Sequence, residues 1–590
     1  MDNGTLASLL DETGSLLEIS GGDAFRIRSY RRAAEAVEQS TLELASVADD
    51  TARLLEVPGI GKGMASNIQA AVATGTFPLR DELLARYPHG ILDLLKLPGM
   101  GPKTVALLWE AAQISSIDQL AEAIDAGRLN DLPRMGQKQI DKLRKGIEDY
   151  RKSAGRFRMD DADEAAEQIT QYLMAFDGIT QVTPAGSLRR GRETAGDLDL
   201  LVTGPACEVD RVAAAVEYTA AYPGIRNLIA RGENKVSFYL ANSLQVDVRL
   251  LPAASYGAAL QYFTGSKMHN VTLRQRALKL GYTLSEYALA RLDDESVIVA
   301  SETEEAIYAA LGMDWIPPEL RENLGEIEAA MQHRLPHLIQ QSDIRGDVHM
   351  HTFATDGKNS IREMAEAALA RGYQYIAITD HSHNLAMTNG LDPERAMEQV
   401  RLIRQVDREF AQEFPGRLRI FPGIEVDILG DGELDLPNEV LAEMDVVIGS
   451  VHTLFQQPKE QMTERILRAL ENPYLRILGH PTGRLLLRRE PYALDLPAIL
   501  KNAASHGVAV EHNASPSRLD LSDRDLRLAK ELGCKIVINT DAHNNGRDLD
   551  KMRFGVRQLR RAWLAAGDVL NTLPADEFLA ALRPRPSSTP

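Results

Sequence analysis

The sequence predicts a multidomain α/β protein with a helical N-terminal region, a mixed α+β centre and a C-terminal domain of βα units. Three related glycine-containing segments recur between helical patterns in the first 150 residues. From about residue 160 short strands mix with helices, and beyond residue 343 apolar strands alternate regularly with amphipathic helices, which is typical of a parallel sheet or barrel. A length of 590 residues allows for about four domains.

The composition is that of an ordinary globular protein, with 44% hydrophobic and 25% charged residues. No apolar run approaches the roughly 20 residues needed to span a bilayer, and the first residues lack the basic and apolar regions of a signal peptide. Cys207 and Cys534 are too few for a disulfide framework or a thiolate metal site. We therefore expect a cytoplasmic protein without a membrane partner.

The net charge of −18 at first argues against a polyanionic partner. The sum hides a local asymmetry, because residues 134–158 carry nine Lys or Arg residues against three acidic ones. This stretch could face phosphates, in which case its binding would depend on salt. On charge alone, however, a solvated helix face is the better explanation.

Three segments of the N-terminal region share one pattern, a short helix, a glycine-containing turn and a second helix. They are LLEVPGIGKGMASNIQAA (54–71), LLKLPGMGPKTVALLWEA (94–111) and LNDLPRMGQKQIDKLRKGI (129–147). Free N–H groups at the start of the second helix form an anion site, and glycines allow close backbone approach. In the third copy Arg134 stands where the others have their first glycine. The pattern resembles the helix-hairpin-helix motif, which grips DNA phosphates without reading sequence, and implies DNA contacts at Gly59, Gly61, Gly99, Gly101 and Gly136.

Three aspartates lie in apolar strand patterns of the central region. Asp197 and Asp199 in GDLDLLV alternate on one strand and so point to the same face, and Asp247 in LQVDVRLL adds a third carboxylate. Three such carboxylates suit one or two hard divalent cations, which can stabilise the attacking and leaving oxygens of a phosphoryl displacement. The loop GSLRRGRETAGD (186–197) just upstream fits a triphosphate cradle. The alternative, that each aspartate only pairs with a neighbouring arginine, explains one of them easily and three poorly.

This segment resembles the nucleotidyltransferase palm, and specifically the X-family DNA polymerases. Their GSxRRG…GDxD motif is matched by Gly186, Ser187, Arg189, Arg190, Gly191, Gly196, Asp197 and Asp199. The resemblance continues through YFTGSKMHNVTLR (262–274) and SEY (285–287), and covers residues 1 to about 318.

The resemblance implies a role for each matched residue. Asp197 and Asp199 would bind two magnesium ions, and Asp247 would be the general base or orient the primer 3′-hydroxyl. Ser187 and Arg190, beside Gly196, would hold the triphosphate. The residues expected to select the deoxyribose are Tyr262, Phe263 and Gly265, and those expected to monitor the nascent pair and the template are Asn270 and Arg274.

One departure concerns the excision of a 5′-deoxyribose phosphate. Family members with this lyase activity use a Schiff-base lysine in the helix after the first hairpin, where this sequence has Asn67, and Gly63 replaces another lysine of that pocket. An amide nitrogen cannot serve as this nucleophile. Tyr30 and Arg26 still match the other wall of the pocket, so the sequence leaves the lyase activity in doubt.

Nine of the thirteen histidines fall between residues 349 and 543. In GDVHMH, YIAITDH, VVIGSVH, LRILGH and KIVINTDAH an apolar strand runs out and a metal-type ligand follows, at the end where barrel folds gather their active sites. Imidazole mixed with carboxylate suits manganese, zinc or iron. A single histidine is more often a core or surface residue, as we expect for His89, His333, His337 and His506. The candidate ligands are His349, His351, Asp356, His381, Glu425, His452, His480, Asp541 and His543.

This pattern resembles the polymerase and histidinol phosphatase (PHP) domain, a distorted βα barrel. The resemblance implies a site for up to three ions of Mn²⁺ or Zn²⁺, with Glu425 as the bridge, that binds a phosphate ester and activates water. His383 and His512 lie nearby in the sequence without an assigned role.

The joint resemblance, an X-family polymerase followed by a PHP domain, implies a template-directed repair polymerase that fills short gaps. The PHP domain would be a manganese-dependent 3′→5′ exonuclease, with abasic-site endonuclease or 3′-phosphatase activity as further options. The expected partners are gapped or primer-template DNA and deoxynucleoside triphosphates, for a monomer associated with the nucleoid. Two alternatives are a small-molecule phosphatase with an appended DNA-binding region, which the hairpin repeats and YFTGS oppose, and a non-catalytic DNA-binding scaffold, which has no use for so many metal ligands.

The expected domains follow from these patterns. They are a helix-hairpin-helix domain (1–80), a second DNA-binding helical subdomain (81–158), a palm (159–250), a thumb for nucleotide selection (251–318), a linker (319–342), the PHP domain (343–575) and a disordered tail (576–590).

Overall fold

The structure is a computed structural model that describes residues 3–39, 44–57, 59–97, 100–129, 132, 135–153, 155–385 and 388–582. The chain divides into two compact units, Met1–Ala154 and Gly155–Pro590. In these described ranges, no helix combines the length and apolarity needed to cross a bilayer.

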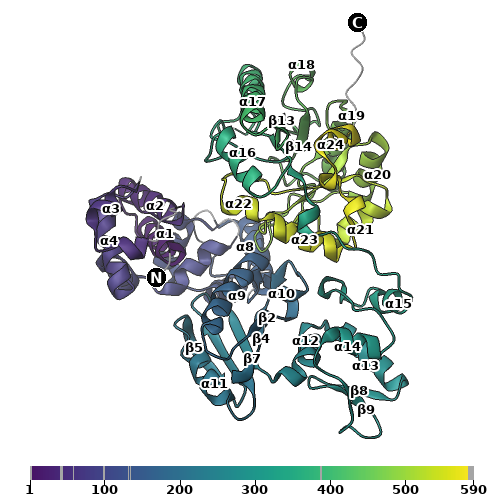
Figure 1. The fold of residues 1–590 in the computed structure, drawn as a ribbon. Coiled ribbons are helices and arrows are strands. Elements are labelled where there is room, and N and C mark those ends of the chain that lie inside the picture. The colour runs from purple at the N-terminus through teal and green to yellow at the C-terminus, as the bar shows by residue number, and fades with distance from the viewer. Residues whose placement is uncertain are drawn as a thin grey trace. The chain divides into compact units, whose positions relative to one another are not determined.

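The described part of the first unit is built from helices (Figure 1). Their apolar residues form one core that includes Leu10, Leu54, Ile68, Leu94 and Leu108. The helices are α1 (Asn3–Ile19), α2 (Ala24–Gln39), α3 (Thr51–Leu55), α4 (Lys62–Thr74), α5 (Pro78–Arg86), α6 (Pro102–Ala112), α7 (Ile117–Asp125) and α8 (Gln137–Ser153).

The three predicted hairpins end in the same local geometry. The carbonyls of Gly61, Gly101 and Gly136 each accept the first i→i−4 hydrogen bond of α4, α6 and α8, at 2.9, 3.0 and 3.1 Å. Each glycine thus starts its helix without a side chain, and leaves the first N–H groups without a side-chain cap at α4 and α6. Gly59 precedes α4 with φ of +100°, which explains a glycine there. Gly99 and Arg134 lie outside the described residues.

The second unit begins with a five-stranded sheet in the order β2-β4-β7-β6-β5. At its centre β4 (Asp197–Thr203) and β7 (Gln245–Leu250) run parallel, whereas the other neighbours are antiparallel. The remaining elements of this layer are β2 (Gln181–Pro184), β5 (Ile225–Arg231), β6 (Lys235–Leu240), a small β1–β3 pair (Phe157–Arg158 and Thr194–Ala195), and the helices α9 (Met159–Met174), α10 (Gly186–Arg189) and α11 (Val212–Ala220). An Asn-Ser turn joins β6 and β7, and Ser243 in this turn has φ of +69°.

A helical and β subdomain follows, with its own apolar core around Leu273, Leu289, Ile307 and Tyr308. Its elements are α12 (Tyr256–Thr264), α13 (Lys267–Lys279), α14 (Glu304–Ala310) and the antiparallel strands β8 (Tyr282–Leu284), β9 (Leu289–Arg291) and β10 (Ile298–Ala300). The segment predicted as a linker (319–342) contains α15 (Glu326–Met331), and its Leu320 and Ile327 are buried in this same core. The connector is therefore packed against the thumb.

The C-terminal domain is a parallel sheet of seven strands in chain order, β11 to β17. A parallel bridge between Met350 and Ala542 joins its two ends, so the sheet is a nearly closed barrel, as the alternation of strands and helices predicts. The strands are β11 (Gly346–Asp347), β12 (Tyr375–Ile378), β13 (Arg419–Asp427), β14 (Val446–Ser450), β15 (Ile477–Leu478), β16 (Ala509–Asn513) and β17 (Ile536–Asn539). Its helices include α16 (Ile361–Ala370), α17 (Pro393–Glu413), α20 (Leu496–His506), α21 (Asp523–Glu531) and α23 (Met552–Arg561).

The predicted disordered tail (576–590) begins too early. Helix α24 (Ala575–Ala581) continues the fold, because Phe578 and Leu582 are fully buried under the barrel and the Phe578 ring lies 4.8 Å from that of Tyr375. Two apolar residues one helical turn apart are enough to hold this segment, although the adjoining RPRPSSTP gives it the composition of a tail. Residues 583–590 lie outside the described part of the chain.

Candidate active sites in the palm and in the PHP barrel

The three predicted palm carboxylates come together at the start of two neighbouring strands. In the parallel register of β4 and β7, Asp199 lies directly opposite Asp247, and Asp197 lies opposite Gln245. Alternation along β4 puts Asp197 and Asp199 on the face that β7 presents with Asp247. The sequence prediction that these residues share one site therefore agrees with the register of the sheet.

The charges of the neighbouring groups differ across this trio. Burial, together with the negative charges of Asp197 and Asp247, raises the pKa of Asp199 to about 6. Burial would also raise the pKa of Asp247, but hydrogen bonds from Lys235 and Ser237 outweigh it and lower the value. The Lys235 ammonium lies 2.7 Å from Asp247 Oδ2, so one cation already balances part of the negative charge.

Two buried oxygens in this region have no hydrogen-bond partner among the described residues, Asp247 Oδ1 and Ser187 Oγ. Buried polar atoms are nearly always satisfied, so the two oxygens indicate a missing ligand. Carboxylate and hydroxyl oxygens are the donors that hard divalent ions prefer, and the trio fits such ions.

The predicted triphosphate loop lies on α10. Gly186 has φ of +57°, and a Cβ there would come within 2.8 Å of Asp199 Oδ2, so the loop passes directly over the carboxylates. Arg190 does not point freely into this space, because its Nε lies 3.1 Å from Glu322 Oε1 and its Nη1 donates to the Thr264 carbonyl. Gly196 is exposed immediately before β4. The loop is thus in place, and its arginine is held by a carboxylate 132 residues away.

The predicted sugar and base contacts gather on α12 and α13. Tyr262 and Phe263 are in edge contact, and the Arg249 guanidinium lies 4.1 Å over the Phe263 ring. Gly265 ends α12 with φ of +69°, which favours glycine. In the same segment Asn270 is buried and donates to the Tyr262 carbonyl at 2.7 Å, whereas Arg274 is exposed.

In the first unit, the doubtful lyase pocket contains an amide in place of an amine. Asn67 on α4 donates to the Tyr30 hydroxyl on α2 at 2.7 Å, and Arg26 lies close enough to affect the pKa of Tyr30. Burial raises that pKa, so the hydroxyl stays protonated. Position 63 is a glycine with open space around it.

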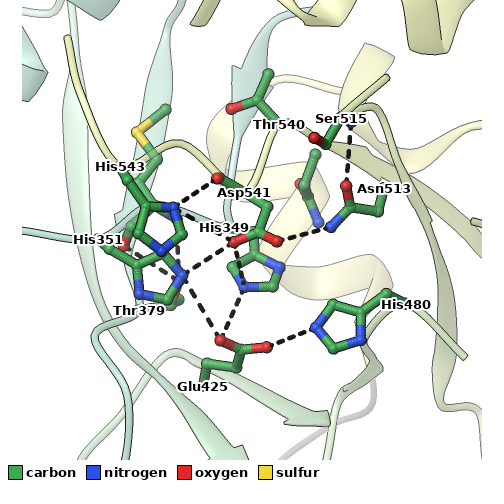
Figure 2. Close-up of polar contacts among 12 residues, drawn as sticks. His349, His351, Thr379, Glu425, His480, Asn513, Ser515, Thr540, Asp541 and His543 are labelled. Atoms are coloured by element: carbon green, nitrogen blue, oxygen red, sulfur yellow. Dashed lines mark hydrogen bonds and ion pairs between the residues drawn. The ribbon is translucent and has the colours of Figure 1, made fainter. Parts of the chain in front are cut away.

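The candidate metal ligands of the C-terminal domain come together in space. Figure 2 shows how His349, His351, Glu425, His480, Asp541 and His543 point toward one another. Each follows the carboxyl end of a strand except Glu425, which lies within β13. The ligand atoms form three overlapping groups, and the predicted residues in them are His349, His351, Asp356, His381, Glu425, His452, Asp541 and His543. The remaining one, His480, approaches Glu425 Oε1 with its Nε2 at 3.0 Å.

Glu425 is at the centre of this cluster. Its carboxylate lies 2.9 Å from His381 Nδ1 and 3.3 Å from the Nε2 atoms of both His349 and His452. Burial would raise its pKa, but the surrounding imidazoles lower it well below the usual range. The glutamate therefore remains ionised and can bridge several neighbours at once.

The pKa values of the imidazoles in this cluster are shifted in opposite directions. Burial and the adjacent His543 and His381 lower the pKa of His351 to about 3. Burial alone would also lower the pKa of His381, but Glu425 and Asp356 raise it to about 10. Without another cation, part of the cluster thus has to hold protons to balance its carboxylates.

The donor set fits metal ions of the borderline class. Several buried atoms of these residues form no hydrogen bond of regular geometry among the described residues, although Glu425 Oε2 lies at ion-pair distance from His381 Nδ1 and His349 Nε2. They are His349 Nε2, His351 Nδ1, His381 Nδ1, His480 Nδ1 and Glu425 Oε2. Such atoms, all at one site, are the expected trace of metal ligands.

Two carboxylates that orient the ligands were not predicted. Glu511 on β16 accepts from His349 Nδ1 and from the His480 backbone N–H, both at 2.8 Å. Asp427 lies 2.5 Å from His452 Nδ1. The period of two in EVD, which puts Asp427 on the face of Glu425, was a signal for one of them. Glu511 follows an apolar pair in a strand and carries no such signal.

The two histidines without a predicted role lie apart from the cluster. His383 is exposed after β12. His512 is buried with its Nδ1 2.8 Å from the Leu521 carbonyl, and alternation along β16 turns it away from Glu511.

Models of known domains match consecutive parts of the chain. They are a helix-hairpin-helix domain (1–77), a SAM-like helix-hairpin-helix tandem (91–149), the DNA polymerase beta palm (156–245), the DNA polymerase beta thumb (259–322) and the PHP domain (347–514).

Individual proteins are similar over different lengths. The DNA polymerase/3′-5′ exonuclease PolX of Bacillus subtilis (strain 168) is 38% identical over 577 residues, which cover 98% of this chain and 98% of the relative. A probable phosphatase of Thermoanaerobacter sp. (strain X514) is 30% identical over 237 residues, 38% of this chain and 89% of its own. Among solved structures, Leishmania infantum polymerase beta in a ternary P/T complex matches 40% of this chain and 98% of its own at 23% identity, with a TM-score of 0.27.

The helical first unit, the palm, the thumb and the nearly closed barrel follow one another as the domain models do, and one relative matches almost the whole chain. This chain belongs to the X family of DNA polymerases and carries a C-terminal PHP domain.

Proposed function

We propose that this chain fills short gaps in DNA by template-directed nucleotidyl transfer in the palm, and that its PHP barrel trims 3′ ends as a 3′→5′ exonuclease. The observation that carries the first half is the direct pairing of Asp199 with Asp247 under the Gly186 loop. The full-length similarity to a protein named as both a polymerase and a 3′-5′ exonuclease supports the combination.

In the palm, Asp197, Asp199 and Asp247 would hold two magnesium ions, which supply charge stabilisation at the attacking and leaving oxygens. Asp247 would orient the primer 3′-hydroxyl or take its proton, since hydrogen bonds keep this carboxylate ionised. Ser187 and Arg190 would bind the triphosphate. Tyr262 and Phe263, fixed in edge contact, would leave no room for a ribose 2′-hydroxyl, and Asn270 would hold the backbone that presents them.

DNA would be held through its phosphates. The first N–H groups of α4, α6 and α8 follow Gly61, Gly101 and Gly136, and backbone amides at helix starts bind anions without surface charge. This explains how a chain of net charge −18 can bind DNA. We infer a monomer that acts on gapped or primer-template DNA.

In the barrel, the nine predicted ligands would hold up to three Mn²⁺ or Zn²⁺ ions, which supply an activated water for attack on phosphorus. Glu425 would bridge the ions, and Glu511 and Asp427 would fix the tautomers of His349 and His452. Because this domain is also similar to a probable phosphatase, a small phosphate ester is the alternative substrate of the barrel.

One paired assay tests both halves. A gapped duplex is incubated with deoxynucleotides and Mg²⁺ for extension, and without nucleotides and with Mn²⁺ for digestion. We expect Asp247→Ala to abolish extension and to spare digestion, and His349→Ala to do the reverse. Extension by Asp247→Ala equal to that of the unmodified chain would defeat the polymerase half. Joint loss of both activities in either variant would argue against two independent sites.

The nature of the PHP substrate is tested separately. A 3′-recessed duplex and free phosphomonoesters are offered to the same preparation with Mn²⁺. Faster hydrolysis of the duplex is expected, and a preference for the small esters would favour a phosphatase with an appended DNA-binding region.

A further inference from the structure

Helix α23 of the PHP domain packs directly on the loop that we assign to the triphosphate (Figure 1). Gln558 Nε2 donates to the Gly191 carbonyl at 2.7 Å, and Arg561 Nη1 donates to the Arg190 carbonyl at 2.7 Å. Both side chains are almost fully buried. A Cβ at Gly191, whose φ is +67°, would lie 3.3 Å from the Arg557 Cβ and 3.5 Å from the Arg561 Cδ.

The same arginine reaches the carboxylate that holds Arg190. Arg561 Nη1 lies 3.0 Å from Glu322 Oε1, and that oxygen lies 3.1 Å from Arg190 Nε. On its other side Arg561 is fixed by Asp523 at 2.8 Å, in the first turn of α21. Glu322 is therefore shared between the palm arginine and a barrel arginine that is itself anchored.

This sharing matters when a nucleotide arrives. A triphosphate that engages Arg190 has to compete with Glu322 for the guanidinium, because both are anions. If Glu322 had no second partner, its release would leave a partly buried carboxylate unpaired, which is costly. Arg561 provides that partner without moving, since it already contacts the same oxygen.

We propose that Arg561, from the PHP domain, is a positioning residue of the polymerase nucleotide site. It fixes the backbone of the triphosphate loop at Arg190 and takes up Glu322 when a deoxynucleoside triphosphate binds Arg190. The PHP domain then contributes to the structure of the polymerase site and also contains a site of its own. The proposal rests on the proposed polymerase function.

The test measures KM for the incoming deoxynucleotide and kcat on a gapped duplex with the full-length chain. Because hydrogen bonds to charged groups are worth about tenfold or more, we expect Arg561→Ala to raise KM roughly tenfold while kcat changes less. Arg561→Lys keeps a positive charge in the same space, so its KM should lie between that of Arg561→Ala and that of the unmodified chain. Arg553→Ala is the matched control, since it removes ion pairs from α23 to Asp163 and Glu167 on α9 but does not contact the loop.

A double variant separates positioning from a general loosening of the junction. With Arg561 absent, Glu322 keeps Arg190 and the more distant Arg192, whose Nη1 lies 3.8 Å from Glu322 Oε1, so it competes more strongly with the triphosphate for Arg190. Glu322→Gln added to Arg561→Ala should therefore bring KM most of the way back to the value of the unmodified chain. Hydrogen exchange at the amides of residues 186–193 should quicken in Arg561→Ala and stay unchanged in Arg553→Ala. Unchanged digestion of 3′ ends by each variant shows that the barrel is folded.

Several outcomes overturn the proposal. A KM of Arg561→Ala equal to that of the unmodified chain, or an equal rise in Arg553→Ala, removes the special role of Arg561. A double variant no better than Arg561→Ala refutes the part assigned to Glu322. If the unmodified chain fails to extend a gapped duplex, the proposed function fails instead, and that result is visible before any variant is compared.

Discussion

Glu511 offers the sharpest test of the PHP metal site, because it contacts the ligands without being one. Its Oε1 accepts from His349 Nδ1 and from Asn539 Nδ2, and its Oε2 accepts from the His480 backbone N–H. In Glu511→Gln one of these oxygens becomes an NH₂ group. Either orientation of the amide then places a donor against a donor in a fully buried position.

The magnitude follows from this mismatch. A buried donor without an acceptor costs about 1–3 kcal/mol, and loss of a carboxylate that orients a ligand lowers metal affinity or activity about 10–100-fold. That range corresponds to about 1.4–2.7 kcal/mol of binding free energy. We therefore expect the affinity of Glu511→Gln for Mn²⁺ to fall by one to two orders of magnitude.

The assay is a titration of the metal-free chain with Mn²⁺ by calorimetry, together with digestion of a 3′-recessed duplex. Glu443→Gln is the matched control, because Glu443 is a half-buried partner of Arg404 in the same domain and does not contact the cluster. Extension by the palm serves as a second control in both variants. If Glu511→Gln bound Mn²⁺ as tightly as Glu443→Gln and digested DNA at the same rate, the role assigned to Glu511 in orienting His349 and His480 at a metal centre would be wrong.

Two further outcomes follow from the charges. Mn²⁺ binding to the barrel should release protons and tighten as pH rises, because groups such as His381, whose pKa is raised to about 10, are protonated without metal. Calorimetry in buffers of different ionisation enthalpy measures the number of protons released, and an absence of proton release contradicts the prediction. In the thumb, burial would raise the pKa of Glu304, but Arg321 and Arg189 lower it to about 2. This shift contributes about 3 kcal/mol to the free energy of unfolding. The contribution should be complete above pH 4.5 and should be lost as the pH falls toward 2. Glu304→Gln should abolish that dependence in chemical denaturation at several pH values, and an unchanged acid profile would refute it.

The convergence of the candidate barrel ligands could be predicted from sequence because each one except Glu425, which lies within β13, follows an apolar strand. A parallel sheet brings all its carboxyl ends to one side, so the local pattern at His381 or His480 already fixes the global position. The palm trio could be predicted for a similar reason, since the alternation of Asp197 and Asp199 sets their face. In both sites the periodicity of the backbone carries the information.

Contacts made by long side chains across domains could not be predicted. Arg190 matches the motif for a triphosphate ligand, but its actual partner, Glu322, lies in the segment expected to be a linker. The arginines of α23 recur every three or four residues, a spacing that is typical of a solvated helix face. Whether such a face meets water or another domain depends on packing between elements hundreds of residues apart, as in the hydrogen bond from Gln558 to Gly191.

The junction also bears on whether the two activities depend on each other. Arg561 binds Asp523 at the start of α21, the preceding Leu521 accepts from His512, and His512 is next to Glu511, which orients His349. Side-chain contacts joined by short stretches of backbone therefore link the triphosphate loop to the histidine cluster. Continuity alone does not couple two sites, because coupling requires an element with two arrangements that both sites bias. Arg561 is fixed on both sides and already contacts Glu322. When a nucleotide binds, Glu322 can therefore leave Arg190 and stay with Arg561 without any movement of α21. For this reason we expect His349→Ala to leave extension intact, even though its site and the palm lie at the two ends of one chain of contacts.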